Sequence, residues 1–217
     1  LTFHDGSACT ARDVVATFEA ILDPKTATPA RQNVGPIAKV TARDASTVVF
    51  TLATPFADLP VTLAYTNAKV LPAAVLKAGL SRLDREAIGT GPFKLVSFEP
   101  ERLIVVARNE SYYDKARPYL DRVQIVVYPD PTAESSALIA GDTDIISTLP
   151  PTEFVRVQKA AGVKALRTPS GQFCNVNFGC DKKPFNDVRV RQAMALSIDR
   201  QAMVSFVTEG FGTVGND

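Results

Sequence analysis

The sequence predicts an α/β fold, in which helices and β-strands alternate along the chain. Two observations carry this prediction. Apolar residues recur at helical spacing in some segments and alternate in others, which separates the two kinds of element. A strand, a helix and a second strand also follow one another over residues 123–146, in the order of a βαβ crossover. Hydrophobic residues make up 46% of the 217-residue chain, which is ordinary for a chain that builds a core.

The first predicted helix begins after Thr10, a candidate N-cap with Asp13 three residues further on. Apolar residues between Val14 and Leu22 then follow helical spacing. Pro24 ends this run, because the residue before a proline disfavours the helical conformation.

A β-hairpin and an irregular segment frame the next region. Residues 39–43 and 47–52 alternate in polarity, and residues 44–46 between them can turn the chain. Residues 26–36 combine Pro, Asn and Gly without periodicity, which predicts a surface loop. Such a loop either binds a ligand or only connects its neighbours.

The remaining elements follow from the same signals. In chain order we expect a short helix from Pro72 to Gly79, a hairpin of residues 93–98 and 103–107, a strand at 123–128, a helix at 131–140 ended by Gly141, a strand at 144–146, a helix at 152–160, an extended run at 173–178 and a last helix after Pro184. Asn186 or Asp187 can cap the last helix. Its apolar positions, which can build a buried face, are Val190, Met194, Leu196 and Ile198.

Charge and cysteine content limit the function classes. The chain has 24 basic and 23 acidic residues and no basic stripe, so nucleic acid is not an expected partner. No apolar run approaches the roughly 20 residues of a membrane span. Of the three cysteines, Cys174 and Cys180 either form a disulfide, which suits an oxidising compartment, or remain buried free thiols like Cys9.

Most catalytic and cofactor signatures are missing. The only histidine, His4, stands beside Asp5, and we interpret it as part of a turn and not of a triad or zinc site. The Gly89-Thr-Gly91 motif lacks the third glycine of a dinucleotide fingerprint, since Lys94 occupies that position. We therefore expect no cofactor and no metal site.

Two further groups of charges give no shared site. Asp142 directly follows Gly141, and we interpret it as part of a turn ahead of the strand expected at 144–146. Arg189 and Arg191 lie about 200° apart on a helix and cannot form one anion clamp.

Several motifs together resemble one known family. These are Phe3-His-Asp-Gly6, Thr10-Ala-Arg-Asp-Val14, Gly89-Thr-Gly-Pro-Phe93, Arg108-Asn-Glu-Ser-Tyr112, Gly141-Asp-Thr-Asp-Ile145 and Lys183-Pro-Phe-Asn-Asp-Val-Arg-Val-Arg191. In this order they resemble the extracytoplasmic solute-binding proteins, family 5, of peptide- and nickel-type ABC transporters. Tyr113 stands where the family often has Trp, and we expect Tyr112 and Tyr113 to pack in the core.

The resemblance implies a fold and a division of the chain. The implied fold is periplasmic-binding-protein-like, class II, cluster C type, as a truncated fragment lacking the N-terminal strands and most of the later lobe. We expect a small α+β subdomain at 1–88, the α/β part of lobe I at 89–182 and the incomplete start of the second lobe at 183–217.

The resemblance also implies a function without catalysis. Two lobes would close on a small solute, such as a peptide, opine, sugar or nickel chelate, and deliver it to a membrane permease. The implied location is the periplasm or another extracytoplasmic space, with or without a lipid anchor. The alternatives are an enzyme or sensor on the same fold, such as a peptide hydrolase, and a purely structural interaction module.

Three segments are candidate solute contacts under this resemblance. The first borders the implied cleft, the second lies where the family runs its interlobe connection, and the third is in the irregular loop. The predicted ligand-binding residues are Tyr65, Thr66 and Asn67, then Phe173, Asn175 and Asn177, and finally Arg31, which can pair with a carboxylate. The alternative for residues 63–67 is an ordinary turn.

Overall fold

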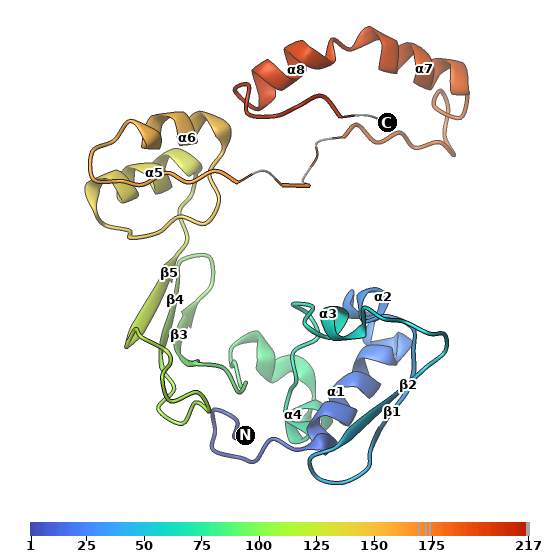
Figure 1. The fold of residues 1–217 in the computed structure, drawn as a ribbon, viewed down its shortest axis with the longest axis vertical. Helices are drawn as coiled ribbons and strands as arrows, with labels where there is room; N and C mark the ends of the chain where they lie inside the picture. The colour runs from blue at the N-terminus through green and yellow to red at the C-terminus, as the bar shows by residue number, and fades with distance from the viewer. Residues whose placement is uncertain (169, 172, 174, 216–217) are drawn as a thin grey trace. The chain divides into compact units, whose positions relative to one another are not determined.

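The computed structural model describes residues 1–168, 170–171, 173 and 175–215. It divides into a first unit, Leu1–Val127, and a second unit, Tyr128–Asp217 (Figure 1). The boundaries expected near Gly89 and Lys183 stay predictions about sub-regions.

Helix α1 (Ala11–Leu22) organises the first unit. Its start is held as predicted: the Asp13 carboxylate accepts the Thr10 N–H at 2.8 Å and the Thr10 hydroxyl at 2.9 Å. The other Asp13 oxygen accepts the Ala73 N–H at 2.9 Å, and the Thr17 hydroxyl accepts the Leu71 N–H at 3.0 Å. Helix α1 thereby fixes the segment that leads into helix α4 (Ala73–Ala78).

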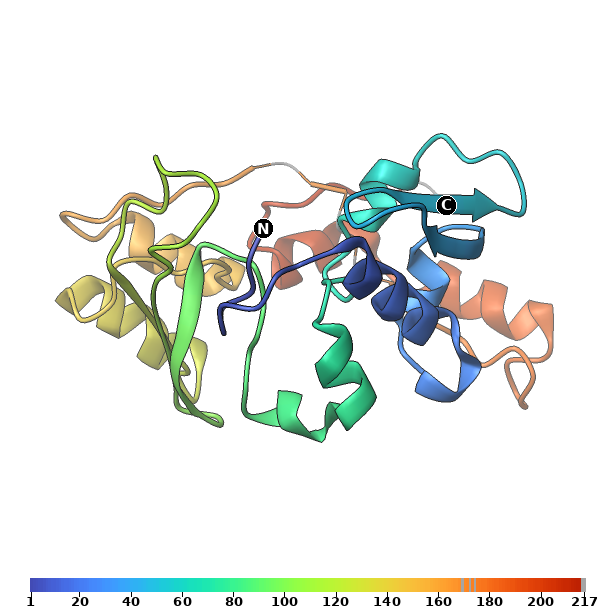
Figure 2. The same cartoon turned by 90° about the horizontal axis from the view of Figure 1, so that it is seen from below.

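The predicted first hairpin is confirmed. Strands β1 (Ile37–Ala42) and β2 (Val48–Leu52) pair antiparallel, and Asp44 accepts the Ser46 N–H at 2.8 Å in the turn. Figures 1 and 2 both show α1 beside this hairpin, where the Phe18 and Phe50 rings meet edge to face at 5.1 Å. The core of the first unit lies between them. Its buried residues are Phe18, Ile21, Ala30, Val34, Ile37, Val40 and Ala68.

The prediction of a surface loop at residues 26–36 is wrong. A 3₁₀ turn, η1 (Pro24–Thr26), is followed by one turn of helix, α2 (Ala30–Asn33). Ala30 and Val34 are fully buried in the core because one helical turn puts residues four apart on the same side. A pair of apolar residues is too short a pattern to reveal this from sequence.

Two short helices and a turn complete this part of the unit. Helix α3 spans Leu59–Leu63, α4 spans Ala73–Ala78, and η2 spans Leu80–Asp84. The helix predicted between Pro72 and Gly79 is confirmed as α4, and Gly79 ends it with φ +106°.

A three-stranded antiparallel sheet, in the order β3-β4-β5, makes the rest of the first unit. Its strands are β3 (Phe93–Glu99), β4 (Leu103–Arg108) and β5 (Arg122–Val126). The second predicted hairpin is thus β3–β4, and the predicted strand at 123–128 is β5. Val105 in the central strand is buried, with 2% of its surface exposed.

In the second unit, α5 (Pro131–Ala140) and α6 (Pro151–Gln158) form as predicted. The Asp130 carboxylate caps α5, and Gly141 ends it with φ +85°. Arg156 of α6 ties the two helices, because its guanidinium donates to the Ser136 hydroxyl of α5 at 2.7 Å. Arg156 also pairs with Glu153 of its own helix at 3.0 Å.

The predicted βαβ crossover is wrong. Residues 144–146 form no strand, and Ile145 is 82% exposed. Within the described residues this segment has no backbone hydrogen bond to a strand, and β5 pairs only with β4, antiparallel. The described part of 173–178 also has no strand assignment, although we expected an extended run.

The last predicted helix is two helices, α7 (Val188–Ser197) and α8 (Arg200–Val207). Asp187, not Asn186, caps α7 by accepting the Arg189 N–H at 2.9 Å. Asp199 caps α8 through the Ala202 N–H at 2.9 Å. The predicted buried face of α7 is wrong: no residue of α7 is buried, and Leu196 is 87% exposed. Met194 is exposed too, whereas Val190 and Ile198 are half-buried.

Candidate functional site

The predicted solute contacts Tyr65, Thr66 and Asn67 form a turn directly after α3. The Tyr65 N–H donates to Thr62 O at 3.1 Å, and the Ala68 N–H donates to Tyr65 O at 2.9 Å. Tyr65 packs against the core, whereas Thr66 and Asn67 are exposed. The turn therefore exposes the Thr66 hydroxyl and the Asn67 amide to solvent, while the buried Ala68 anchors the turn in the core.

Arg31 stands on α2 with its side chain exposed. The end of α2 is tied to α3, because the Thr62 hydroxyl donates to Val34 O at 3.3 Å. The structure therefore joins the end of the helix that carries Arg31 to the helix that precedes the 65–67 turn.

The other predicted contacts belong to the second unit. Phe173 is 78% exposed, and the Asn175 amide donates to the Asn177 side-chain oxygen at 2.6 Å. The two asparagines thus share one side of the chain. Gln172 and Cys174, in the same segment, lie outside the described residues, and so does any pairing of Cys174 with Cys180. Cys180 is exposed and Cys9 is half-buried, so the expectation of buried thiols is wrong for Cys180.

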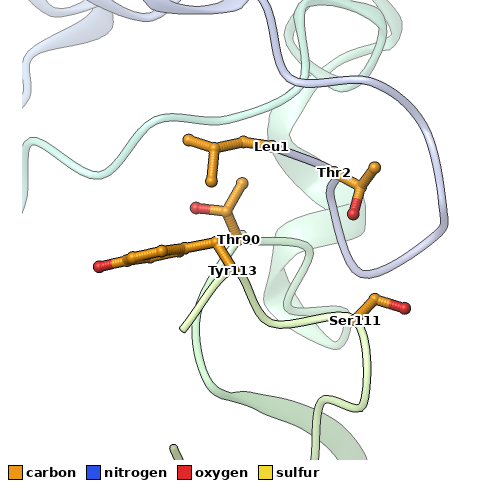
Figure 3. Close-up of a pocket in the computed structure, with 5 residues that line it drawn as sticks. All are labelled: Leu1, Thr2, Thr90, Ser111 and Tyr113. Carbon is orange, nitrogen blue, oxygen red and sulfur yellow. The ribbon is translucent and has the colours of Figure 1, made fainter. Parts of the chain in front are cut away.

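None of these residues lines either of the two depressions found in the first unit. One, of about 240 Å³, is lined by Leu1, Thr2, Thr90, Ser111 and Tyr113 (Figure 3). Figure 3 shows the Thr90 and Ser111 hydroxyls pointing away from each other, so they do not converge on one ligand atom. The other, of about 500 Å³, lies between α1 and β1.

The expectation that both tyrosines pack in the core is wrong for Tyr113. Its side chain is 68% exposed, and its ring lies 4.5 Å from that of Tyr112, centre to centre. The family pattern predicted an aromatic residue at this position but carried no information on its exposure.

His4 has the structural role that the sequence favoured. Its Nδ1 accepts the Gly89 N–H at 3.3 Å, so its Nε2 carries the hydrogen that it donates to Gly91 O at 3.0 Å. Gly91 O accepts a second hydrogen bond, from the Asn109 side chain at 2.9 Å. Both ring nitrogens of His4 are therefore occupied by the main chain.

The charged groups singled out in the sequence form no shared centre. The Asp142 N–H donates to Ala137 O at 2.9 Å, in the turn that ends α5. Arg189 pairs with Asp187, while Arg191 donates to Phe185 O at 2.6 Å. Across the described residues, no three His, Cys, Asp or Glu side chains are grouped to hold a metal ion. Lys94, which occupies the position of the third glycine of a dinucleotide fingerprint, lies in strand β3 and not at a helix start.

Hydrogen bonding sets the electrostatics of two carboxylates. Burial raises the pKa of Asp13, but the hydrogen bonds from Ala73 and Thr10 outweigh burial and hold the pKa below its usual value. The Arg189 side chain lowers the pKa of Asp187, and the pKa of Arg189 rises in return. Both carboxylates are ionised at neutral pH and serve helix starts.

The chain matches the model of the bacterial extracellular solute-binding proteins, family 5 middle, over residues 1–217. It therefore belongs to this family, and the resemblance noted from the motifs is confirmed. No helix among the described residues has the length and apolar character that a membrane crossing needs.

Individual relatives agree with the family. The probable D,D-dipeptide-binding periplasmic protein DdpA of Escherichia coli is 30% identical over 219 residues, which are 97% of this chain and 41% of DdpA. The structure of AgaA in complex with agropinic acid, from A. tumefacien, matches with a TM-score of 0.84 and 33% identity over 98% of this chain. NikZ from Campylobacter jejuni, in complex with Ni(L-His), matches all of this chain with a TM-score of 0.86 and 26% identity.

These matches confirm the predicted α/β, periplasmic-binding-protein-like fold class. The chain spans 43% of the AgaA chain and 44% of the NikZ chain. It thus corresponds to less than half the length of the relatives it matches.

Proposed function

We propose that this chain is part of the solute-binding component of an ABC importer, which captures a small solute by closing two lobes over it. The observation that carries the proposal is the family match over residues 1–217. Closure would require that the solute prefer the closed state, since a ligand shifts a conformational equilibrium only by its differential affinity. The closed form would then dock on a membrane permease, on the extracytoplasmic side.

The solute we propose is a small molecule bearing a carboxylate, with peptides first. DdpA is named as a probable D,D-dipeptide-binding protein, and the AgaA and NikZ structures are complexes with agropinic acid and Ni(L-His). A dipeptide, an organic acid and histidine each carry a carboxylate, which a guanidinium binds through two parallel hydrogen bonds. Sugars and other nickel chelates remain alternatives within the same function.

For the contacts we propose the residues predicted from sequence. Arg31 offers an exposed guanidinium on α2, whose end is hydrogen-bonded to α3, the helix before the turn that carries Thr66 and Asn67. This places a cation, a hydroxyl and an amide on neighbouring segments of the first unit. The Tyr65 side chain packs against the core and anchors this turn. Phe173, Asn175 and Asn177 would supply the second set of contacts.

We propose a non-catalytic role. The only histidine has both ring nitrogens bonded to the main chain, so it is not free to act as a general base. The alternative, a peptide hydrolase on the same fold, would need a nucleophile and a base other than His4. A structural interaction module, the third possibility, predicts that no small molecule binds.

The test is a ligand screen on the full-length protein. Melting temperatures would be compared with di- to hexapeptides, opines, oligosaccharides and nickel chelates, since a ligand that binds only the folded state stabilises it by about 2.7 kcal/mol at 100 times its Kd. A shift with one class, without product formation, supports the proposal. Absence of any shift in folded protein contradicts it, and turnover of the solute favours the hydrolase.

Arg31→Ala gives the residue-level test. Loss of a charge-assisted hydrogen bond costs about 1.5–3 kcal/mol, so the affinity for a carboxylate solute should fall about 10- to 100-fold. Arg43→Ala is the matched control, because Arg43 is an exposed arginine on the β1–β2 turn of the same unit. Equal affinities for the two variants would remove Arg31 from the site.

A further inference from the structure

His4 lies where two parts of the first unit are joined. It precedes α1, whereas residues 85–92 are the covalent connection from η2 to β3. The His4 main-chain N–H donates to Gly89 O at 2.8 Å, and its ring bonds the Gly89 N–H and Gly91 O. Three hydrogen bonds of one residue therefore supplement the covalent connection.

Asn109 extends this junction into the sheet. It directly follows β4, is only 3% exposed, and donates through its side chain to Gly91 O at 2.9 Å and through its main chain to Pro92 O at 2.8 Å. The carbonyl of Gly91 thus joins His4, ahead of α1, to Asn109, at the end of β4. If the covalent connection were the only link, residues 1–84 could rotate relative to the β3-β4-β5 sheet. These hydrogen bonds restrict that rotation.

We propose that His4 is a positioning residue, which sets the orientation of residues 1–84 relative to the β3-β4-β5 sheet and thereby places Arg31 and the 65–67 turn for solute binding. The effect of His4 on this orientation follows from its hydrogen bonds alone. The consequence for solute binding rests on the proposed function. His4 acts through the main chain at Gly89 and Gly91 and contacts no solute itself.

Two conservative variants separate the bonds of His4. In His4→Asn the amide oxygen occupies the place of Nδ1 and keeps an acceptor for the Gly89 N–H. In His4→Gln the amide nitrogen occupies the place of Nε2 and keeps the donor to Gly91 O. Gly91 O still has Asn109 as a donor in both, whereas the Gly89 N–H loses its acceptor in His4→Gln. We expect His4→Asn to preserve the orientation and His4→Gln to lose it.

The orientation is measured without solute. Spin labels would be placed on Lys39, exposed on β1, and Gln124, exposed on β5, of the full-length protein with its native cysteines replaced. The distance distribution should keep its width in His4→Asn and broaden in His4→Gln. Thr17→Val is the control, because it removes hydrogen bonds to Leu71 away from the junction and should lower stability without broadening the distribution. An unbroadened distribution in His4→Gln overturns the proposal.

Solute affinity gives the second measurement, taken well below the melting temperature of each variant. If one tenth of the His4→Gln molecules hold the competent orientation, the apparent solute affinity of that variant falls about tenfold. The His4→Asn and Thr17→Val variants should bind solute as the unmodified protein does. Broadened distances with unchanged affinity overturn the role in binding. If no solute binds the unmodified protein, the proposed function fails, and the label distances still decide whether His4 sets the orientation.

Discussion

Replacing Asp13 by Asn tests how α1 holds the first unit together. One Asp13 oxygen accepts the Ala73 N–H, and the other accepts the Thr10 N–H and hydroxyl. Asparagine has the same shape but only one acceptor oxygen, and its NH₂ group can only donate. Whichever way the amide turns, one of the two main-chain N–H groups faces another donor.

The magnitude follows from burial. Asp13 is only 8% exposed, so water cannot easily replace the lost acceptor. A buried donor left unpaired costs about 1–3 kcal/mol, and the bonds lost here are charge-assisted. We therefore expect Asp13→Asn to lower the free energy of unfolding by about 2–3 kcal/mol.

Urea denaturation of the full-length variants, followed by circular dichroism, measures this difference from the midpoints if the slope is unchanged. The matched control is Asp58→Asn, because Asp58 is exposed and its side chain makes no capping hydrogen bond to α3. Its effect should stay within about 0.5 kcal/mol. A loss below about 0.5 kcal/mol for Asp13→Asn would refute the reasoning.

Three further predictions concern the same unit. Gly35→Ala should cost at least about 1 kcal/mol in urea denaturation, because φ is +83° and the new Cβ would lie 2.7 Å from the Phe56 ring. Val34→Ala should cost about 2 kcal/mol, since Val34 is fully buried, whereas Val96→Ala, at a 57% exposed site, should change stability little. The lowered pKa of Asp13 means that its stabilisation is complete above the unfolded value of 3.8 and is lost as pH falls through the folded value; acid titration of Asp13→Asn should therefore show a shallower loss below about pH 4.

Local signals predicted most of the elements of this fold. The α1 start could be predicted because Thr10 and Asp13 act within one turn, and Gly141 ends α5 through its own backbone freedom. Failures arose where the decisive contact is distant. The burial of Ala30 depends on packing against other elements of the core, which no window of sequence around it contains.

The candidate site was less predictable than the fold. His4 could be assigned a structural role because it is the only histidine, but its partners lie 85 and 87 residues away along the chain. The exposure of Tyr113 depends on how the loop after β4 folds, which its aromatic character does not report. The seven proposed solute contacts remain predictions, because affinity, not geometry within one unit, identifies a binding residue.

Ser135 limits how α5 and α6 can diverge among related sequences. It has no exposed surface, and its hydroxyl donates to Pro131 O of its own helix at 2.7 Å. A side chain of this size sets the spacing between the two helices. Alanine would fit the same space, whereas a bulkier residue would require the helices to separate and the Arg156 contacts to α5 to be rebuilt. The size of the residue at position 135 thus determines how closely α5 and α6 can approach each other.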